Sequence, residues 1–239
     1  MALYHSSDEN AAESSGTLTI VGLGPGTAGH LSLETLRLLE TNTVILRTAV
    51  HPTVEELKNR GIAYISCDSF YEKGESFEEV YDNIALFVLE QAARENVVYA
   101  VPGSPLVAER TVVLLRDRAA GCGISLQIKP AMSFLDLAYA NLEIDPIDGL
   151  RIIDAQDVEA LAEAGRYPLM VTQVYNRMVA SDMKLSLMDT LPDETEVWFL
   201  RNLGLEDKEC RKIPLFEIDR QPEIDHLTSV FIPPQPQEA

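Results

Sequence analysis

Short apolar runs and amphipathic segments alternate along the first half of the chain. The apolar runs end at glycine, proline or polar residues, and segments with helical spacing of apolar residues follow them. This alternation is typical of a mostly parallel sheet with helices on both faces. The predicted strands are residues 18–23, 43–47, 63–67, 97–101 and 125–129, and the predicted helices are 31–40, 52–60, 77–95 and 105–120.

The pattern changes after residue 130. A helix (133–142) and a turn-rich connection (143–150) precede two strands that flank a short helix, and a longer helix follows. Three strands then arrive with short spacers, which favours a mixed or antiparallel sheet. The predicted elements are strands 150–154, 167–174, 196–203, 210–218 and 227–233, and helices 157–165 and 176–191.

These patterns predict an α/β fold made of two α/β domains. The first, residues 17–130, has a mostly parallel sheet, and the second, residues 131–233, has a mixed sheet. We expect residues 1–16 to be a disordered tail and residues 234–239 to be a linker or tail, because both stretches are polar.

Composition narrows the class of protein and of partner. The 239 residues are 46% hydrophobic and 24% charged, as in soluble globular proteins, and the net charge is −19. So acidic a surface disfavours nucleic acid and anionic membranes as partners. The chain has no apolar run of about 20 residues and no signal-peptide pattern, so we expect a cytoplasmic protein. Cys67, Cys122 and Cys210 are far apart, which predicts free thiols and no metal site.

The first predicted strand runs into a loop with three glycines, Gly22, Gly24 and Gly26. Their spacing, G-x-G-P-G, is one residue shorter than the dinucleotide fingerprint, and Pro25 removes an N–H donor. Arg47 and Thr48 stand where a ribose-binding acid is expected. NAD binding is therefore a minority interpretation, and a glycine turn without a ligand also stays open.

Two further segments carry candidate chemistry. Residues 102–105, Pro-Gly-Ser-Pro, repeat the geometry of strand, glycine turn and helix, and both loops belong at the carboxyl edge of a parallel sheet. Ser133 is a natural N-cap for the helix that follows it. We expect Glu109 to be a solvated helix charge. His30 and His51, each beside a helix start, are expected to be structural.

In this order, the three segments resemble those of the tetrapyrrole methylase family. The family's V-G-x-G-P-G loop is matched by Val21 to Gly26, its G-D-P loop by residues 103–105, and its P-G-x-S-S-F-like segment by residues 130–134. Ser104 departs from the family's usual aspartate. The resemblance extends over residues 17–233 and is closer still to the methylase-like N-terminal domain of bacterial MazG-family proteins, many of which carry a nucleotide pyrophosphohydrolase domain.

The resemblance implies a methyltransferase that uses S-adenosylmethionine, bound in a cleft between the two domains. It also implies a small-molecule methyl acceptor, a homodimer and, in a longer chain, a fused MazG-type domain. Arg47 and Tyr71 are the candidates for facing the substrate, and the catalytic residue stays unassigned. The implied cofactor contacts are Leu23, Gly24, Pro25, Gly26, Gly103, Ser104, Pro105, Leu106, Val107, Ser133, Phe134, Val174, Tyr175, Leu203, His226 and Thr228.

Two alternatives remain from other functional classes. One is a non-catalytic module that senses the cofactor or serves as a scaffold for a fused hydrolase. The other is an NAD-linked oxidoreductase, which the loop spacing and the missing acid disfavour.

Overall fold

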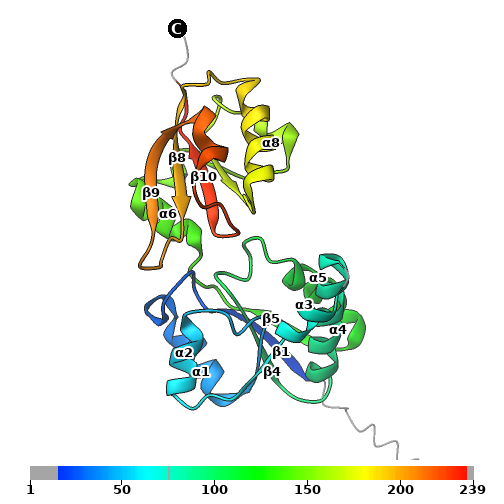
Figure 1. Cartoon of the computed structure of the whole chain (residues 1–239). Helices are drawn as coiled ribbons and strands as arrows, with labels where there is room; N and C mark the ends of the chain where they lie inside the picture. Colours follow the sequence, from blue (N-terminus) through cyan, green and yellow to red (C-terminus); the bar gives the residue numbers. More distant parts are fainter. Residues whose placement is uncertain (1–15, 75, 236–239) are drawn as a thin grey trace, which may run out of the picture. The chain divides into compact units, whose positions relative to one another are not determined.

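The computed structural model describes residues 16–74 and 76–235, which form two compact units (Figure 1). Unit 1 comprises residues 16–23 and Leu31–Ala131, and unit 2 comprises Gly24–His30 and residues 132–235. The segment Gly24–His30 thus groups with unit 2, although it lies within the sequence range of the first predicted domain. The predicted tails lie almost entirely outside the described residues.

Unit 1 contains a five-stranded parallel sheet in the order β3-β2-β4-β1-β5. The three central strands, β2, β4 and β1, are short runs of mostly β-branched and aliphatic residues, which suits a sheet covered on both faces. The strands are β1 (Thr17–Gly22), β2 (Thr43–Leu46), β3 (Tyr64–Ser66), β4 (Val97–Val101) and β5 (Ser125–Ile128), and the helices are η1 (Ala28–His30, in unit 2), α1 (Leu33–Thr41), α2 (Thr53–Asn59), α3 (Asp68–Lys73), α4 (Phe77–Ala92), α5 (Arg110–Ala119) and η2 (Ala120–Cys122).

Alternate residues of these strands enter two separate cores. In β4, Val97, Tyr99 and Val101 pack with α4 and α5, whereas Val98 and Ala100 pack with α1 and α2. This division follows from the two-residue period of a strand. Figure 1 shows the two groups of helices on opposite sides of the sheet, which confirms the predicted arrangement.

Unit 2 contains a mixed sheet in the order β6-β7-β10-β8-β9, as expected for the second half of the chain. The pair β6–β7 is parallel and the other pairs are antiparallel. One face packs against α7, α8 and η4. The elements are α6 (Phe134–Leu142), η3 (Pro146–Asp148), β6 (Arg151–Asp154), α7 (Val158–Leu161), β7 (Leu169–Thr172), α8 (Arg177–Met188), β8 (Glu196–Arg201), β9 (Glu209–Pro214), η4 (Leu215–Arg220) and β10 (Thr228–Ile232).

Local differences from the prediction include two misplaced boundaries and one helix that was not predicted. The helix expected from residue 105 begins at Arg110, because Ala108 has a left-handed φ of 53° that interrupts any helix there. The strand expected to reach residue 218 ends at Pro214, and Leu215 and Ile218 are buried from a 3-10 helix instead. Helix α3 was not predicted, since six residues are too few to show a helical period.

Candidate functional site

The carboxyl ends of β1, β2 and β4 lie at one edge of the sheet in unit 1. The Leu23 N–H donates to the Val101 carbonyl at 2.8 Å, and the Arg47 N–H donates to the Ala100 carbonyl at 2.9 Å. These bonds extend the ladders by one residue beyond the strands. The loops that follow therefore begin side by side, at the edge where open α/β sheets bind their ligands.

Gly22 shows why the first loop must begin with glycine. A Cβ at this position would lie 2.1 Å from the Gly103 carbonyl oxygen and 2.6 Å from the Ala131 Cβ. No side chain fits at such distances. The first loop, the loop after β4 and the segment entering unit 2 are thus packed together, although about 80 and 110 residues separate them in sequence from Gly22.

Gly103 has a different environment. Its φ is 63°, and no atom lies within 4 Å of the place where a Cβ would be. The backbone there is open to a close approach, which fits a ligand held by main-chain groups. The rest of this loop is tightly folded. The buried Ser104 accepts a hydrogen bond from the Leu106 N–H at 3.4 Å, and its carbonyl accepts from the Val107 N–H at 3.2 Å. Pro105 is buried and Leu106 is 66% exposed.

In unit 2, the segment Gly24–His30 packs against the turn after β8. A Cβ at Gly26 would lie 2.4 Å from the Gly204 carbonyl oxygen, and a Cβ at Gly204 would lie 2.9 Å from the Pro25 carbonyl oxygen. His30 and Leu137 of α6 also adjoin Gly204. Unit 2 therefore brings Pro25 and Gly26 next to the turn that contains Leu203.

Ser133 caps α6 as predicted. Its hydroxyl accepts from the Leu135 N–H at 3.1 Å, and the Asp136 carboxylate accepts from the Ser133 N–H at 2.7 Å, which completes a capping box. Phe134 is half-buried in the first turn of the helix.

The remaining predicted contacts lie at one edge of the sheet in unit 2, beyond the ends of β7 and β8 and at the start of β10. Strand β10 is antiparallel to both neighbours, so its first residues adjoin the last residues of β7 and β8. The side chains differ in accessibility: Val174, Leu203 and Thr228 are buried, and Tyr175 and His226 are exposed. The side chain of Val174 lies in the core, so this residue could contact a ligand only through its main chain.

The expectation that Glu109 is a solvated helix charge is wrong. It is 8% exposed, and its carboxylate Oε1 lies 3.4 Å from Arg47 Nε and accepts from the Thr111 hydroxyl at 2.6 Å. The left-handed turn at Ala108 immediately precedes Glu109, at the point where the chain enters α5. A buried carboxylate needs such partners, because desolvation disfavours its charge.

The guanidinium of Arg47 lies 5.9 Å from the ring centroids of both Tyr71 and Tyr81. Burial is the largest single effect and opposes its charge, but the Glu109 carboxylate and the neighbouring tyrosines together outweigh it, so the pKa of Arg47 lies above its ordinary value. Burial raises the pKa of Tyr71 to about 12, against the opposing effect of the Arg47 charge. Both candidates for facing the substrate are therefore in one cluster. Nothing in the sequence indicated that Glu109 and Tyr81 would lie beside Arg47 and Tyr71.

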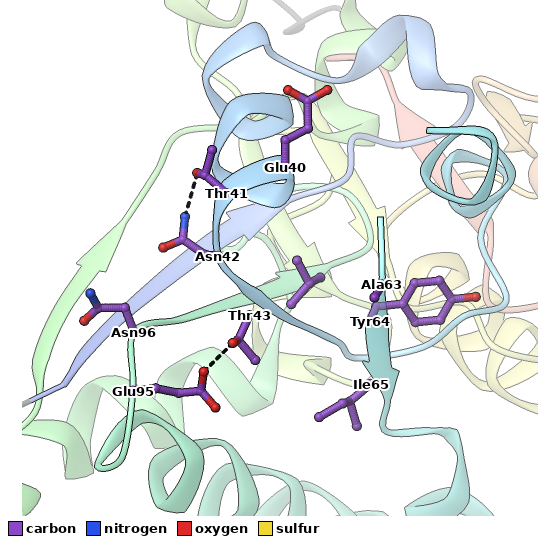
Figure 2. Close-up of a pocket in the computed structure, with 10 residues that line it drawn as sticks. Glu40, Thr41, Asn42, Thr43, Ala63, Tyr64, Ile65, Glu95 and Asn96 are labelled. Atoms are coloured by element: carbon purple, nitrogen blue, oxygen red, sulfur yellow. Dashed lines mark hydrogen bonds between the residues drawn. The ribbon is translucent and has the colours of Figure 1, made fainter. Parts of the chain in front are cut away.

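Other features of the described residues lie away from this cluster or carry no site. A hollow at the opposite, amino edge of the sheet in unit 1 is lined by residues that begin β2, β3 and β4, and it contains no predicted site residue (Figure 2). Burial raises the pKa of the Cys67 thiol to about 12, and the three cysteines are unpaired. Within residues 16–74 and 76–235, no cluster of His, Cys, Asp and Glu is arranged to hold a metal, and no helix is long and apolar enough to span a membrane.

The family model for tetrapyrrole (corrin/porphyrin) methylases matches residues 17–219, most of the chain. The chain belongs to the tetrapyrrole methylase family. It is 42% identical over 224 residues to YabN of Bacillus subtilis (strain 168), an uncharacterized protein, and this match covers 93% of the chain and 46% of YabN.

Fungal relatives are more distant. The chain is 28% identical over 136 residues to the methyltransferase and cyclic peptide lentinulin A precursor ledMA of Lentinula edodes, a match that covers 55% of the chain and 32% of that protein. The chain thus spans less than half the length of these curated relatives.

Solved structures of two methyltransferases share the fold. The methyltransferase CobJ superposes with a TM-score of 0.69 at 18% identity, covering 92% of the chain and 95% of CobJ. Uroporphyrin-III C-methyltransferase from Thermus thermophilus, in complex with S-adenosylhomocysteine, gives a TM-score of 0.66 at 18% identity, covering 91% and 97%. These neighbours confirm the arrangement of two α/β domains.

Proposed function

We propose that the chain is an S-adenosylmethionine-dependent methyltransferase of the tetrapyrrole methylase type. The observation that carries the proposal is the open left-handed backbone of Gly103, beside the close packing of Gly22. This loop offers main-chain groups to a ligand at the edge of the sheet where α/β folds bind theirs. We further propose that the sixteen residues implied by the family resemblance contribute contacts from both units.

The residues of the chain would mainly hold and orient the reactants. When bound, S-adenosylmethionine supplies an activated methyl group with its own leaving group, so the protein needs no nucleophile for that step. The main chain of Gly103 and Ser104 would bind and orient the cofactor, and the apolar side chains of Leu106 and Leu203 would exclude water. Such positioning is the main contribution a protein makes to this chemistry.

Thermal denaturation with two competing ligands tests the choice of cofactor. S-adenosylhomocysteine at a large excess over its dissociation constant should stabilise the native state by about 3 kcal/mol, and NAD should not. A rise in Tm with NAD and none with S-adenosylhomocysteine would support the oxidoreductase instead.

For the methyl acceptor we propose only a chemical class, either a small molecule or a peptide segment. The name of the Thermus thermophilus neighbour points to a tetrapyrrole, and the name of the Lentinula edodes relative points to a peptide. Mass spectrometry of reactions containing a porphyrinoid or a peptide, with S-adenosylmethionine, would separate the two by which product gains a methyl group.

A second candidate is a non-catalytic domain that binds the cofactor or acts as a scaffold for a MazG-type pyrophosphohydrolase. Its support is the length of YabN, which continues well beyond the part that this chain matches. Cofactor binding without methylation of either acceptor class would favour this candidate.

The quaternary and cellular assignments are also proposals. We propose a cytoplasmic homodimer, on the resemblance to the family and on the acidic composition. Sedimentation equilibrium of the purified chain tests the homodimer, because a monomer mass at micromolar concentration would contradict it.

A further inference from the structure

A partly buried ion pair with two aromatic neighbours lies beside the proposed cofactor loop in unit 1. Arg47 follows β2, Tyr71 comes from α3, Tyr81 comes from α4, and Glu109 directly precedes α5. The Arg47–Glu109 contact measures 3.4 Å, and both tyrosine rings lie 5.9 Å from the guanidinium. Side chains from three other elements therefore surround the guanidinium of Arg47.

The Glu109 carboxylate is also held by a hydrogen bond from a residue other than Arg47. The Thr111 hydroxyl donates to Glu109 Oε1 at 2.6 Å, and the hydroxyl of the fully buried Tyr99 lies 3.1 Å from that of Thr111. The residue before Glu109, Ala108, has a left-handed φ of 53°. Strained backbone at a non-glycine residue is concentrated at functional sites. The network holds the carboxylate, and through it the guanidinium, in one place.

The cluster keeps unused hydrogen-bonding capacity. A guanidinium has five N–H donors, and the ionic contact of Arg47 within residues 16–74 and 76–235 is made through Nε to Glu109. The Arg47 side chain remains 24% exposed. The Tyr71 hydroxyl is buried and adjoins the Arg47 side chain, and it makes no well-aligned hydrogen bond to the described residues 16–74 and 76–235. Buried polar atoms are usually paired, so this hydroxyl needs an explanation.

Charge selects the kind of group that would fit. Arg47 and Glu109 already neutralise each other, so a carboxylate entering the cluster would face Glu109 across a single guanidinium. The exposed charges nearby on α3 and the first turn of α4 are mainly acidic. Phe77, 71% exposed, stacks on Tyr81 with a centroid distance of 6.1 Å and adds a flat apolar surface. An uncharged carbonyl on a planar group suits these surroundings better than an anion.

We propose that Arg47, Tyr71, Tyr81 and Glu109 form an acceptor-recognition site that hydrogen-bonds an uncharged carbonyl oxygen, as in an amide or ketone. Arg47 and Tyr71 donate to that oxygen, and Glu109 is a positioning residue that holds Arg47 and repels carboxylates. The assignment to an acceptor rests on the proposed methyltransferase function.

The test compares two probes of equal shape, benzamide and benzoate, on the full chain. The side-chain Nε–H signal of Arg47 is followed by NMR during each titration. Benzamide should bind at least about tenfold more tightly than benzoate. In Glu109→Gln the preference should reverse, because Arg47 loses its compensating charge. Glu56→Gln, which removes an exposed pair with Arg60 in the same unit, is the matched control and should keep the wild-type preference.

The wild-type titration decides the proposal even if Glu109→Gln does not fold. Tighter binding of benzoate, or no change in the Arg47 signal with either probe, would overturn it. Titration of the same samples with S-adenosylhomocysteine separates the two proposals. If the cofactor product binds and neither probe does, the recognition site is wrong and the methyltransferase proposal stands. If benzamide binds and the cofactor product does not, the carbonyl-binding site stands, but the methyltransferase proposal is wrong and the assignment of this site to a methyl acceptor is wrong with it.

Discussion

Gly103 and Gly123 have nearly the same backbone conformation but lie at opposite edges of the sheet in unit 1. Their φ angles are 63° and 69°, and neither has an atom within 4 Å of a built Cβ. Gly103 follows the end of β4, whereas Gly123 precedes β5. The pair therefore separates the cost of left-handed backbone from the cost of blocking a ligand.

Replacing each glycine by valine provides the first prediction. Gly103→Val and Gly123→Val should each lose about 1–2 kcal/mol of unfolding free energy, because β-branched residues disfavour positive φ. Only Gly103→Val should weaken binding of S-adenosylhomocysteine, by at least about tenfold in calorimetry. Equal affinities in the two variants would remove the loop after β4 from the site.

Individual residues also mark the limit of what the sequence could predict. The sequence indicated the glycine loop and the helix cap at Ser133, because these residue types have strong backbone preferences at fixed spacing. Glu109 was misassigned because its burial depends on the left-handed turn at Ala108, and alanine gives no signal for such a turn. The cluster around Arg47 was not predicted for a related reason. Its four members come from four elements, and only tertiary packing brings them together.

At the scale of elements, α6 begins at a residue that the resemblance also assigns to the cofactor. Ser133 completes a capping box, whereas Ser32 caps α1 through a similar bond to the Thr35 N–H at 3.0 Å. A cap contributes about 1 kcal/mol to stability. The two serines thus form a matched pair.

Ser133→Ala and Ser32→Ala should each lower the unfolding free energy by about 1 kcal/mol in urea denaturation. Ser133→Ala alone should also lower the affinity for S-adenosylhomocysteine. If the two variants bind it equally well, Ser133 acts only as a helix cap.

Elements of regular length were the most predictable part of the fold. The strands of unit 1 were placed within one or two residues, since most of them are short runs rich in apolar residues that end at a polar or turn residue. The start of α5 and the end of β9 were misplaced, because a left-handed alanine and a proline followed by a 3-10 helix are set by local packing. The helix α3 was too short to be recognised.

At the scale of the whole molecule, acidic groups link stability to pH. Burial tends to raise the pKa values of Asp68, Asp219 and Asp225, but their hydrogen bonds and ion pairs outweigh it and hold the values below the ordinary 3.8. A carboxyl with a lowered native pKa stabilises the folded state above its unfolded pKa and loses that contribution as the pH falls through the native value.

The unfolding free energy should therefore decrease as the pH is lowered from about 5 to about 3. Asp225→Asn removes the carboxyl that accepts two hydrogen bonds from Arg201, at 2.8 and 3.0 Å. This variant should be less stable than the wild type at pH 6. Its unfolding free energy should also change less between about pH 5 and about pH 3, as measured by urea denaturation at each pH. A slope equal to that of the wild type would exclude Asp225 as a contributor.

Isothermal titration of the full chain with S-adenosylhomocysteine is the most direct test of the central claim that this fold binds the methyl-donor cofactor. The account predicts a saturable heat of binding at ligand concentrations up to about 1 mM. The absence of any heat over this range, in a sample whose circular dichroism shows a folded α/β protein, would contradict it.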